Sequence, residues 1–200
     1  MTDYFALLAE PRRPWLDPDS LKQKFLALSS GAHPDRVHNA TATEKEAAQQ
    51  RYTTLNTAYA CLREPKDRLR HLLELEFGEK PKDIQSIPSD LMDFFMEVSY
   101  LCRQTDSFLS EKNASASPLI QVQMFERSQE RTEKLMELQR VLNSRRDRLE
   151  SELKMLDAGW NVAERQEVAV LQRLEGIYRL FSYYARWGGQ LQERIVQLAF

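Results

Sequence analysis

The tetrapeptide His33-Pro34-Asp35-Arg36 lies in a polar stretch of the chain between two amphipathic segments. In the segment before it, Asp17-Pro18 predicts the start of a helix, because aspartate caps a first turn and proline suits the first helical position. Gly31 predicts the end of this helix. The apolar residues of the segment recur at helical spacing, as Leu21, Phe25 and Leu28.

The segment after the tetrapeptide predicts a second helix, over about residues 43–63. Thr43 followed by Glu46 is typical of a capping box, in which each side chain accepts a backbone N–H bond from the other residue. The apolar positions of this helix are Ala47, Tyr52, Leu55, Ala58, Tyr59 and Leu62. Because each segment has an apolar stripe, we expect the two helices to pack antiparallel and to present the tetrapeptide in the loop between them.

The rest of the chain also carries helical rather than strand patterns. A short helix is predicted near Asp3–Ala9 and another over 66–77, and the proline-containing stretch 78–88 predicts a linker. Three further helices are expected, over about 89–112, from Pro118 to a turn at 158–161, and from that turn to the C-terminus. Gly188-Gly189 is expected to interrupt the last of them, with a kink or a close helix approach. The expected fold class is therefore all-α, with an N-terminal antiparallel helix pair and a C-terminal three-helix antiparallel bundle.

The composition excludes several classes of protein. Of the 200 residues, 42% are hydrophobic and 29% are charged, which is typical of a folded globular chain. No apolar run approaches the roughly 18 residues of a membrane span, and the N-terminus lacks the pattern of a signal peptide. A net charge of −2 argues against a general nucleic-acid binder. We therefore expect a cytoplasmic protein with no membrane and no nucleic-acid partner.

Residues suited to catalysis or metal binding are not grouped in this sequence. It has no phosphate-binding glycine loop, no nucleophile elbow and no HExxH pair. Cys61 and Cys102 do not combine with the histidines at any spacing known for zinc, and we expect both to be free thiols. The sequence therefore predicts no enzyme activity, no metal and no cofactor.

The tetrapeptide and its flanking residues resemble the J-domain family in order and in spacing. The matching residues are Asp3-Tyr4-Phe5, Leu8, Leu16-Asp17, Leu21, Phe25, His33-Pro34-Asp35-Arg36, Leu55-Asn56-Thr57-Ala58-Tyr59, Leu62, Pro65, Arg68 and Leu72-Leu73. The resemblance implies a co-chaperone that binds a DnaK/HscA-type ATPase chaperone and stimulates its ATP hydrolysis. The residues that it assigns to chaperone binding are His33, Pro34, Asp35 and Arg36, with Lys22 and Lys24 steering the encounter electrostatically.

Within the J-domain proteins, the chain resembles the HscB type, the co-chaperones of iron–sulfur cluster biogenesis. The resemblance rests on an N-terminal J-domain that is followed by a helical region and not by a Gly/Phe-rich or zinc module. It implies a J-domain over 1–77, a linker over 78–88 and, over 89–200, a bundle that binds an IscU-like iron–sulfur scaffold protein. The implied scaffold-binding residues are Leu91, Met92, Phe95 and Phe181, of which we expect at least two to be exposed and close together.

Two other interpretations of the C-terminal region stay open. Its longest helix has leucines at heptad spacing, namely Leu135, Leu138, Leu142, Leu149, Leu153 and Leu156. Such a stripe also suits dimerisation, or the docking of a different helical client by a J-domain protein. The third interpretation is a helical structural protein in which the tetrapeptide is inactive, and an ATPase-stimulation assay separates it from the others.

Overall fold

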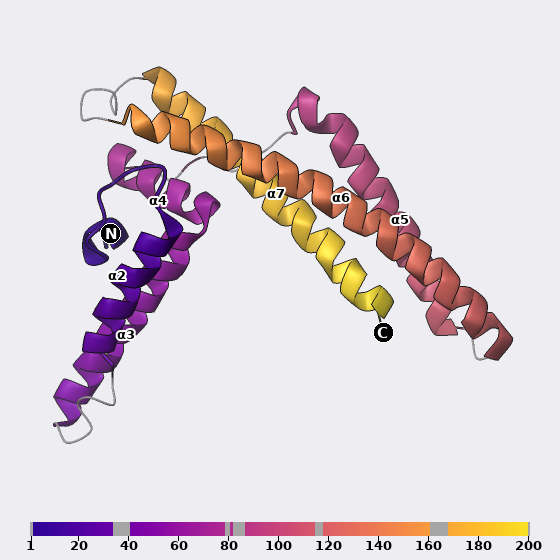
Figure 1. Ribbon diagram of the computed structural model, residues 1–200, viewed down its shortest axis with the longest axis horizontal. Coiled ribbons are helices and arrows are strands. Elements are labelled where there is room, and N and C mark those ends of the chain that lie inside the picture. The colour runs from indigo at the N-terminus through magenta and orange to yellow at the C-terminus, as the bar shows by residue number, and fades with distance from the viewer. Residues whose placement is uncertain are drawn as a thin grey trace. The chain divides into compact units, whose positions relative to one another are not determined.

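The computed structural model describes residues 2–33, 41–78, 81, 87–114, 118–160 and 168–199. Within these ranges every regular element is a helix, so the all-α prediction is confirmed (Figure 1). The elements in chain order are α1 (Tyr4–Leu7), α2 (Pro18–Gly31), α3 (Ala42–Arg63), α4 (Pro65–Phe77), the 3-10 turn η2 (Ser89–Leu91), α5 (Met92–Ala114), α6 (Pro118–Ala158) and α7 (Val168–Ala199). None of the helices in the described part of the chain combines the length and the hydropathy needed to cross a bilayer.

The starts of α2 and α3 follow from local side-chain chemistry. Asp17 accepts a 2.8 Å hydrogen bond from the Ser20 N–H and precedes Pro18, as the sequence predicts. The start predicted for α3 is wrong by two residues, because the capping box is formed by Thr41 and Glu44 and not by Thr43 and Glu46. The Thr41 N–H donates to Glu44 Oε2 at 2.9 Å, and this earlier box places an acidic side chain in the first turn of the longer helix.

The first compact unit comprises Met1–Lys82 and Glu150–Tyr178, so it contains α1–α4 with the end of α6 and the start of α7. α2 and α3 lie side by side and antiparallel, which confirms the predicted helix pair (Figure 1). Phe25 of α2 is half-buried and stacks on Tyr59 of α3, with ring centroids 4.3 Å apart. The buried core of this unit is Phe5, Leu8, Leu16, Leu21, Ala32, Leu55, Ala58, Leu62 and Leu72.

The second compact unit comprises Asp83–Leu149 and Arg179–Phe200, which are α5 and the adjoining parts of α6 and α7. Arg127 of α6 pairs with Glu111 near the end of α5, so these two helices run antiparallel. The Lys112 Nζ donates to the Leu198 carbonyl, which places the C-terminal ends of α5 and α7 together. The largest core side chains of this unit include Phe94, Phe108, Leu135, Leu142, Trp187 and Leu191.

The predicted interruption of the last helix is wrong, because α7 continues through Gly188-Gly189. The close approach is present instead: a Cβ on Gly188 would lie 3.5 Å from Gln139 Nε2 and 3.7 Å from Leu142 Cδ2 of α6. The predicted domain boundaries stay a prediction, since much of 78–88 lies outside the described residues. The grouping of Glu150–Tyr178 with the N-terminal helices is a feature that the sequence analysis did not anticipate.

Candidate chaperone and scaffold interfaces

His33 follows the last turn of α2, whose C-cap residue is Ala32. Its imidazole is half-buried and meets the ring of Tyr52 of α3 edge-on, with centroids 5.3 Å apart. The other residues assigned to the chaperone-binding loop, Pro34, Asp35 and Arg36, lie outside the described residues. The structure therefore places the first residue of the tetrapeptide at the end of the α2–α3 pair, held against α3 by an aromatic contact.

The two lysines assigned to electrostatic steering differ in their surroundings. Lys24 pairs with Glu10 at 3.0 Å and donates to the Ala9 carbonyl at 3.1 Å, so its charge is compensated within the fold. Lys22 is exposed and has no ion pair among the described residues. Leu26, one turn from Lys22 on α2, has 52% of its surface exposed. Sequence reasoning missed Leu26 because it lies outside the Leu21, Phe25, Leu28 stripe.

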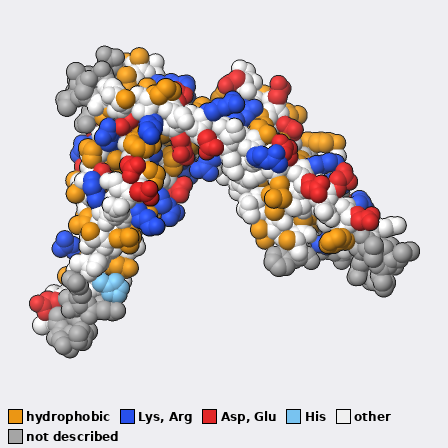
Figure 2. Space-filling view, viewed as in Figure 1, with side chains coloured by type: hydrophobic (Ala, Val, Ile, Leu, Met, Phe, Trp, Pro, Cys, Tyr) orange, Lys and Arg blue, Asp and Glu red, His pale blue; other side chains and the backbone are white. Residues whose placement is uncertain are grey.

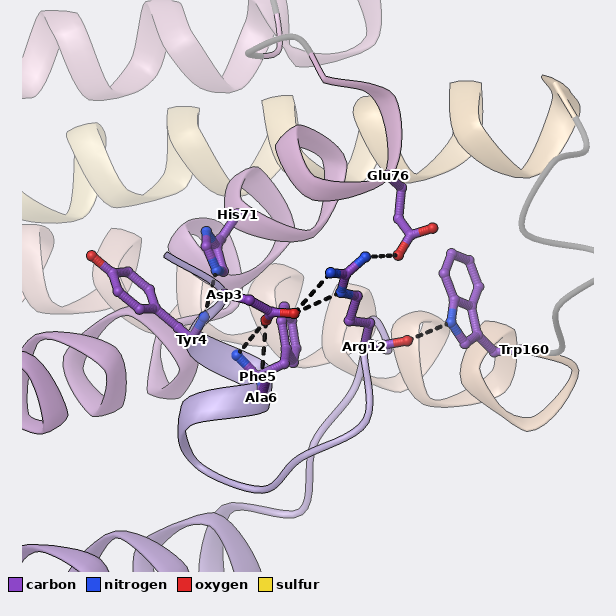
Figure 3. Close-up of polar contacts among 8 residues, drawn as sticks. All are labelled: Asp3, Tyr4, Phe5, Ala6, Arg12, His71, Glu76 and Trp160. Carbon is purple, nitrogen blue, oxygen red and sulfur yellow. Dashed lines mark hydrogen bonds and ion pairs between the residues drawn. The ribbon is translucent and has the colours of Figure 1, made fainter. Parts of the chain in front are cut away.

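A network of polar contacts holds α1 and the loop that follows it (Figure 3). Asp3 caps α1 by accepting from the Phe5 and Ala6 N–H groups, and it also pairs with Arg12 at 2.8 Å. Arg12 reaches Glu76 of α4 at 3.5 Å. Burial raises the pKa of Asp3, but the hydrogen bonds from Ala6 and Arg12 outweigh it and hold the pKa below its usual range. This network fixes the N-terminal segment to α4.

His71 of α4 completes the attachment of α1. The Tyr4 N–H donates to His71 Nε2 at 3.1 Å, and the imidazole stacks on the ring of Tyr4 at 4.5 Å and on that of Phe5 at 5.8 Å (Figure 3). Only 5% of the His71 surface is exposed, and burial lowers the pKa of the imidazole. An Nε2 that accepts from a backbone N–H carries no proton, so this geometry requires a neutral histidine.

The end of α6 contacts the loop between α1 and α2 within the same compact unit. Asp157 is buried and accepts from Arg13 Nε at 2.8 Å and from the Trp15 N–H at 3.3 Å. The Trp160 indole N–H donates to the Arg12 carbonyl at 2.9 Å (Figure 3). The α1–α2 loop is therefore clamped by side chains that follow it by more than 140 residues in the sequence.

Arg68 of α4 supports the other side of this loop. It is 4% exposed, and it donates to the Pro14 carbonyl at 2.9 Å and to the Leu62 carbonyl at 2.7 Å. Burial lowers the pKa of Arg68 to about 10. The guanidinium therefore remains charged at neutral pH and ties α3 and α4 to the α1–α2 loop.

Two of the four residues implied for scaffold binding are buried. Leu91 is 3% exposed and Phe181 is 2% exposed, so both belong to the core. Leu91 lies on the same helical face as the buried Phe94 and Val98, and Phe181 continues the buried stripe of α7. Phe95 is half-buried near Trp187, and only Met92 is exposed. The expectation of at least two exposed residues among the four is therefore wrong.

A different row of α5 side chains faces solvent. Met92 is 41% exposed, Met96 is 53% exposed and Tyr100 is 58% exposed. These residues are spaced by four, so they follow one another along one face of the helix. We call this row the α5 stripe. Of these residues the sequence analysis named only Met92, although the spacing of four residues extends the row to Met96 and Tyr100.

The described residues contain no group of three or more histidine, cysteine or acidic side chains able to hold a metal ion. Cys61 and Cys102 are both free thiols, as the sequence predicts. Burial raises the pKa of Cys61 to about 11 and also raises that of Cys102, so both thiols stay protonated at neutral pH.

The sequence is similar to that of known co-chaperones over part of its length. Over 91 residues the chain is 37% identical to the co-chaperone protein HscB homologue of Bordetella pertussis, and equally to those of Bordetella parapertussis and Bordetella bronchiseptica. Each match covers 46% of this chain and 51% of the relative, so the chain spans about half the length of the curated relatives it matches. No protein-family model matches the chain.

Two solved structures share the fold over nearly the whole chain. The chaperone HscB from Vibrio cholerae has a TM-score of 0.63 at 22% identity, and the alignment covers 98% of this chain and 99% of that one. The human co-chaperone protein HscB has a TM-score of 0.59 at 19% identity, with coverage of 98% and 81%. The chain is therefore similar in sequence, over 91 residues, to HscB co-chaperone homologues, and it shares the fold of two solved HscB structures.

Proposed function

We propose that the chain is a non-enzymatic, cytoplasmic adaptor of iron–sulfur protein maturation. In this proposal the segment His33–Arg36 stimulates the ATPase of a DnaK/HscA-type chaperone, and the C-terminal helices hold an IscU-like scaffold protein. The observation that carries the proposal is the position of His33 at the end of the α2–α3 pair in a chain similar in sequence to HscB co-chaperone homologues. It needs neither a metal nor a cofactor on this chain.

The chaperone side of the proposal rests on chemistry that suits a transient docking loop. Tyr52 holds the His33 ring at the end of the helix pair, which lowers the ordering cost of binding. The Asp35 carboxylate suits an arginine on the chaperone, because guanidinium and carboxylate form short, paired hydrogen bonds. On α2, the uncompensated charge of Lys22 and the exposed side chain of Leu26 offer a basic and an apolar contact one turn apart.

The test of this side is single-turnover ATP hydrolysis by the chaperone in the presence of the full chain. We expect the wild-type chain to accelerate hydrolysis and His33→Gln to lose the acceleration. Arg51→Gln is the matched control, because Arg51 is exposed on α3 beside Tyr52 and lies outside the tetrapeptide. Acceleration by His33→Gln at the wild-type level, with an unchanged melting temperature, contradicts this half of the proposal.

The scaffold side of the proposal rests on the α5 stripe. Exposed apolar rows are uncommon on monomers and often mark interaction surfaces. Methionine suits such a surface because its flexible thioether adapts to the partner, and tyrosine supplies a large contact area at low entropic cost. In this proposal, Leu91, Phe95 and Phe181 do not contact the scaffold. They pack under α5 and so support the α5 stripe.

Titration of the apo-scaffold into the full chain, read by calorimetry, tests this half. We expect the double substitution Met92→Ala and Met96→Ala to weaken scaffold binding by about 1 kcal/mol or more. Met136→Ala on α6 is the matched control, because Met136 is 54% exposed and lies outside the α5 stripe. Equal losses in the two variants, or no loss in the double variant, contradict the assignment of the stripe.

The leucine heptads of α6 do not offer an exposed surface through which the chain could dimerise. Leu135, Leu138, Leu142, Leu149 and Leu153 are all less than 10% exposed, and Leu156 is half-buried. These leucines of α6 are therefore already buried by packing within the chain. No observation favours a second function over the proposed one.

A further inference from the structure

An open groove lies on α6 beside α7, within the second compact unit. Its volume is about 600 Å³, which is in the range of sites that take several side chains or a small ligand. The groove shares no residue with the α5 stripe or with the tetrapeptide. Its lining residues are Val141, Ser144, Arg145, Arg148, Leu149 and Tyr184.

Neither of the two arginines of the groove has a carboxylate partner among the described residues, unlike several other arginines of these helices. Elsewhere in the unit, Arg127 pairs with Glu111, Arg140 with Glu137 and Arg194 with Asp106. Arg145 is held by an aromatic contact, with its guanidinium carbon 4.6 Å from the centroid of the Phe94 ring.

That contact leaves the N–H donors of Arg145 without a hydrogen-bond acceptor in the described part of the chain. Arg148 lies one turn further along α6 and is exposed. Two guanidinium groups at this spacing therefore line one side of an open groove, and both retain their hydrogen-bonding capacity.

The lining favours an anion that also carries an apolar part. Guanidinium groups bind carboxylates through paired hydrogen bonds, and the Ser144 hydroxyl adds a further donor. Val141, Leu149 and the Tyr184 ring supply apolar walls, of which Val141 is 37% exposed. Nucleic acid is a poor match for this chain, because the net charge is −2 and the face drawn in Figure 2 carries acidic side chains among the basic ones.

We propose that this groove docks an acidic segment of a partner protein, with carboxylate side chains about one helical turn apart on Arg145 and Arg148. Charge complementarity selects this occupant, since uncompensated arginines on apolar walls match glutamate or aspartate spaced among apolar residues. The site adds a third contact surface to the chain, separate from the two surfaces of the proposed function.

The probe is a fluorescein-labelled peptide of about ten residues in which pairs of glutamates alternate with leucines, read by fluorescence anisotropy against the full chain. We expect saturable binding that weakens at least tenfold in Arg148→Glu, because a like charge replaces a pairing one. Arg186→Gln is the matched control, since Arg186 is exposed on α7 and does not line the groove, and its affinity is expected to stay within about twofold of the wild type.

Two further arms separate the possible ligands. The same peptide with glutamine in place of glutamate is expected not to bind, and inorganic phosphate at matched ionic strength is expected not to displace the acidic peptide. The proposal is overturned by the absence of saturable binding, by equal affinity of the glutamine peptide, or by unchanged affinity in Arg148→Glu. Displacement by phosphate also overturns it, in favour of a small-anion site. Neither the chaperone nor the scaffold is present, so these outcomes do not depend on the proposed function.

Discussion

His71 makes the stability of the first compact unit depend on pH. Its neutral Nε2 accepts a hydrogen bond from the Tyr4 N–H. Protonation of Nε2 breaks this bond, because two N–H donors then face each other. Burial lowers the pKa of His71 below 6.5; of the nearby charges, Asp3 and Glu74 raise the pKa and Arg12 opposes them, as does Arg70. The folded chain therefore binds this proton less readily than the unfolded chain.

The sign of the effect follows from this difference in proton affinity. Because the pKa is lower in the folded state, the unfolded state binds more protons between the two pKa values, and stability falls as pH falls through this window. The contribution of His71 is fully present above its ordinary pKa of 6.5 and is lost as pH drops through the folded value. We expect the melting temperature to be lower at about pH 5 than at about pH 7.5 for this reason.

The substitution His71→Phe isolates the hydrogen bond from the stacking. Phenylalanine keeps a ring against Tyr4 and Phe5 but leaves the Tyr4 N–H without its acceptor, which costs about 1–3 kcal/mol. In a chain of this size each kcal/mol lowers the melting temperature by about 2–4 °C. His71→Phe should therefore melt several degrees lower at neutral pH and show a smaller further loss on acidification.

Thermal unfolding followed by circular dichroism at the two pH values measures both effects. His33→Gln is the control, because it removes a histidine that does not accept from the Tyr4 N–H, and it should keep the pH dependence of the wild type. If His71→Phe loses as much stability on acidification as the wild type does, the reasoning from the buried imidazole is refuted.

Two further changes test the packing of the first unit. Arg68→Leu is expected to lower the free energy of unfolding by about 2–4 kcal/mol, because two buried carbonyls lose their donor; a loss below about 1 kcal/mol in urea denaturation would show that water replaces the guanidinium. Phe25→Ala is expected to cost about 2–3 kcal/mol, less than a fully buried phenylalanine, because its ring is half-buried against Tyr59. A double-mutant cycle of Phe25 and Tyr59 that shows no coupling would contradict the stacking contribution.

The fold of the helix pair was predictable because its determinants are local. Asp17-Pro18 starts α2 through contacts within four residues, and periodic apolar positions identify the buried faces of α2 and α3. The start of α3 was mispredicted because Thr41 and Thr43 each have a glutamate three residues later, and the pattern does not rank them. The Asp157–Arg13 contact was not predictable from patterns, because it joins residues 144 positions apart.

The candidate interface residues were predictable only in part, because the sequence shows helical faces but not what packs against them. A helical pattern shows that Leu91, at the end of η2, and Met92, at the start of α5, point in different directions. Only the packing shows that Leu91 faces the core. The same limit applies to Phe181, because the residues three and four positions away on α7 are all apolar, namely Ile177, Tyr178, Tyr184 and Ala185. The compensation of Lys24 by Glu10 depends on the course of the α1–α2 loop, which the sequence does not specify.

The proposed function is the coupling of a chaperone ATPase to a bound scaffold. Its most direct test is the single-turnover rate of ATP hydrolysis by the DnaK/HscA-type chaperone with the full chain and the apo-scaffold both present. We expect strong acceleration by the wild-type chain and none by Asp35→Asn, although the variant should still bind the scaffold in calorimetry. Equal acceleration by Asp35→Asn, or none by the wild-type chain, would contradict it.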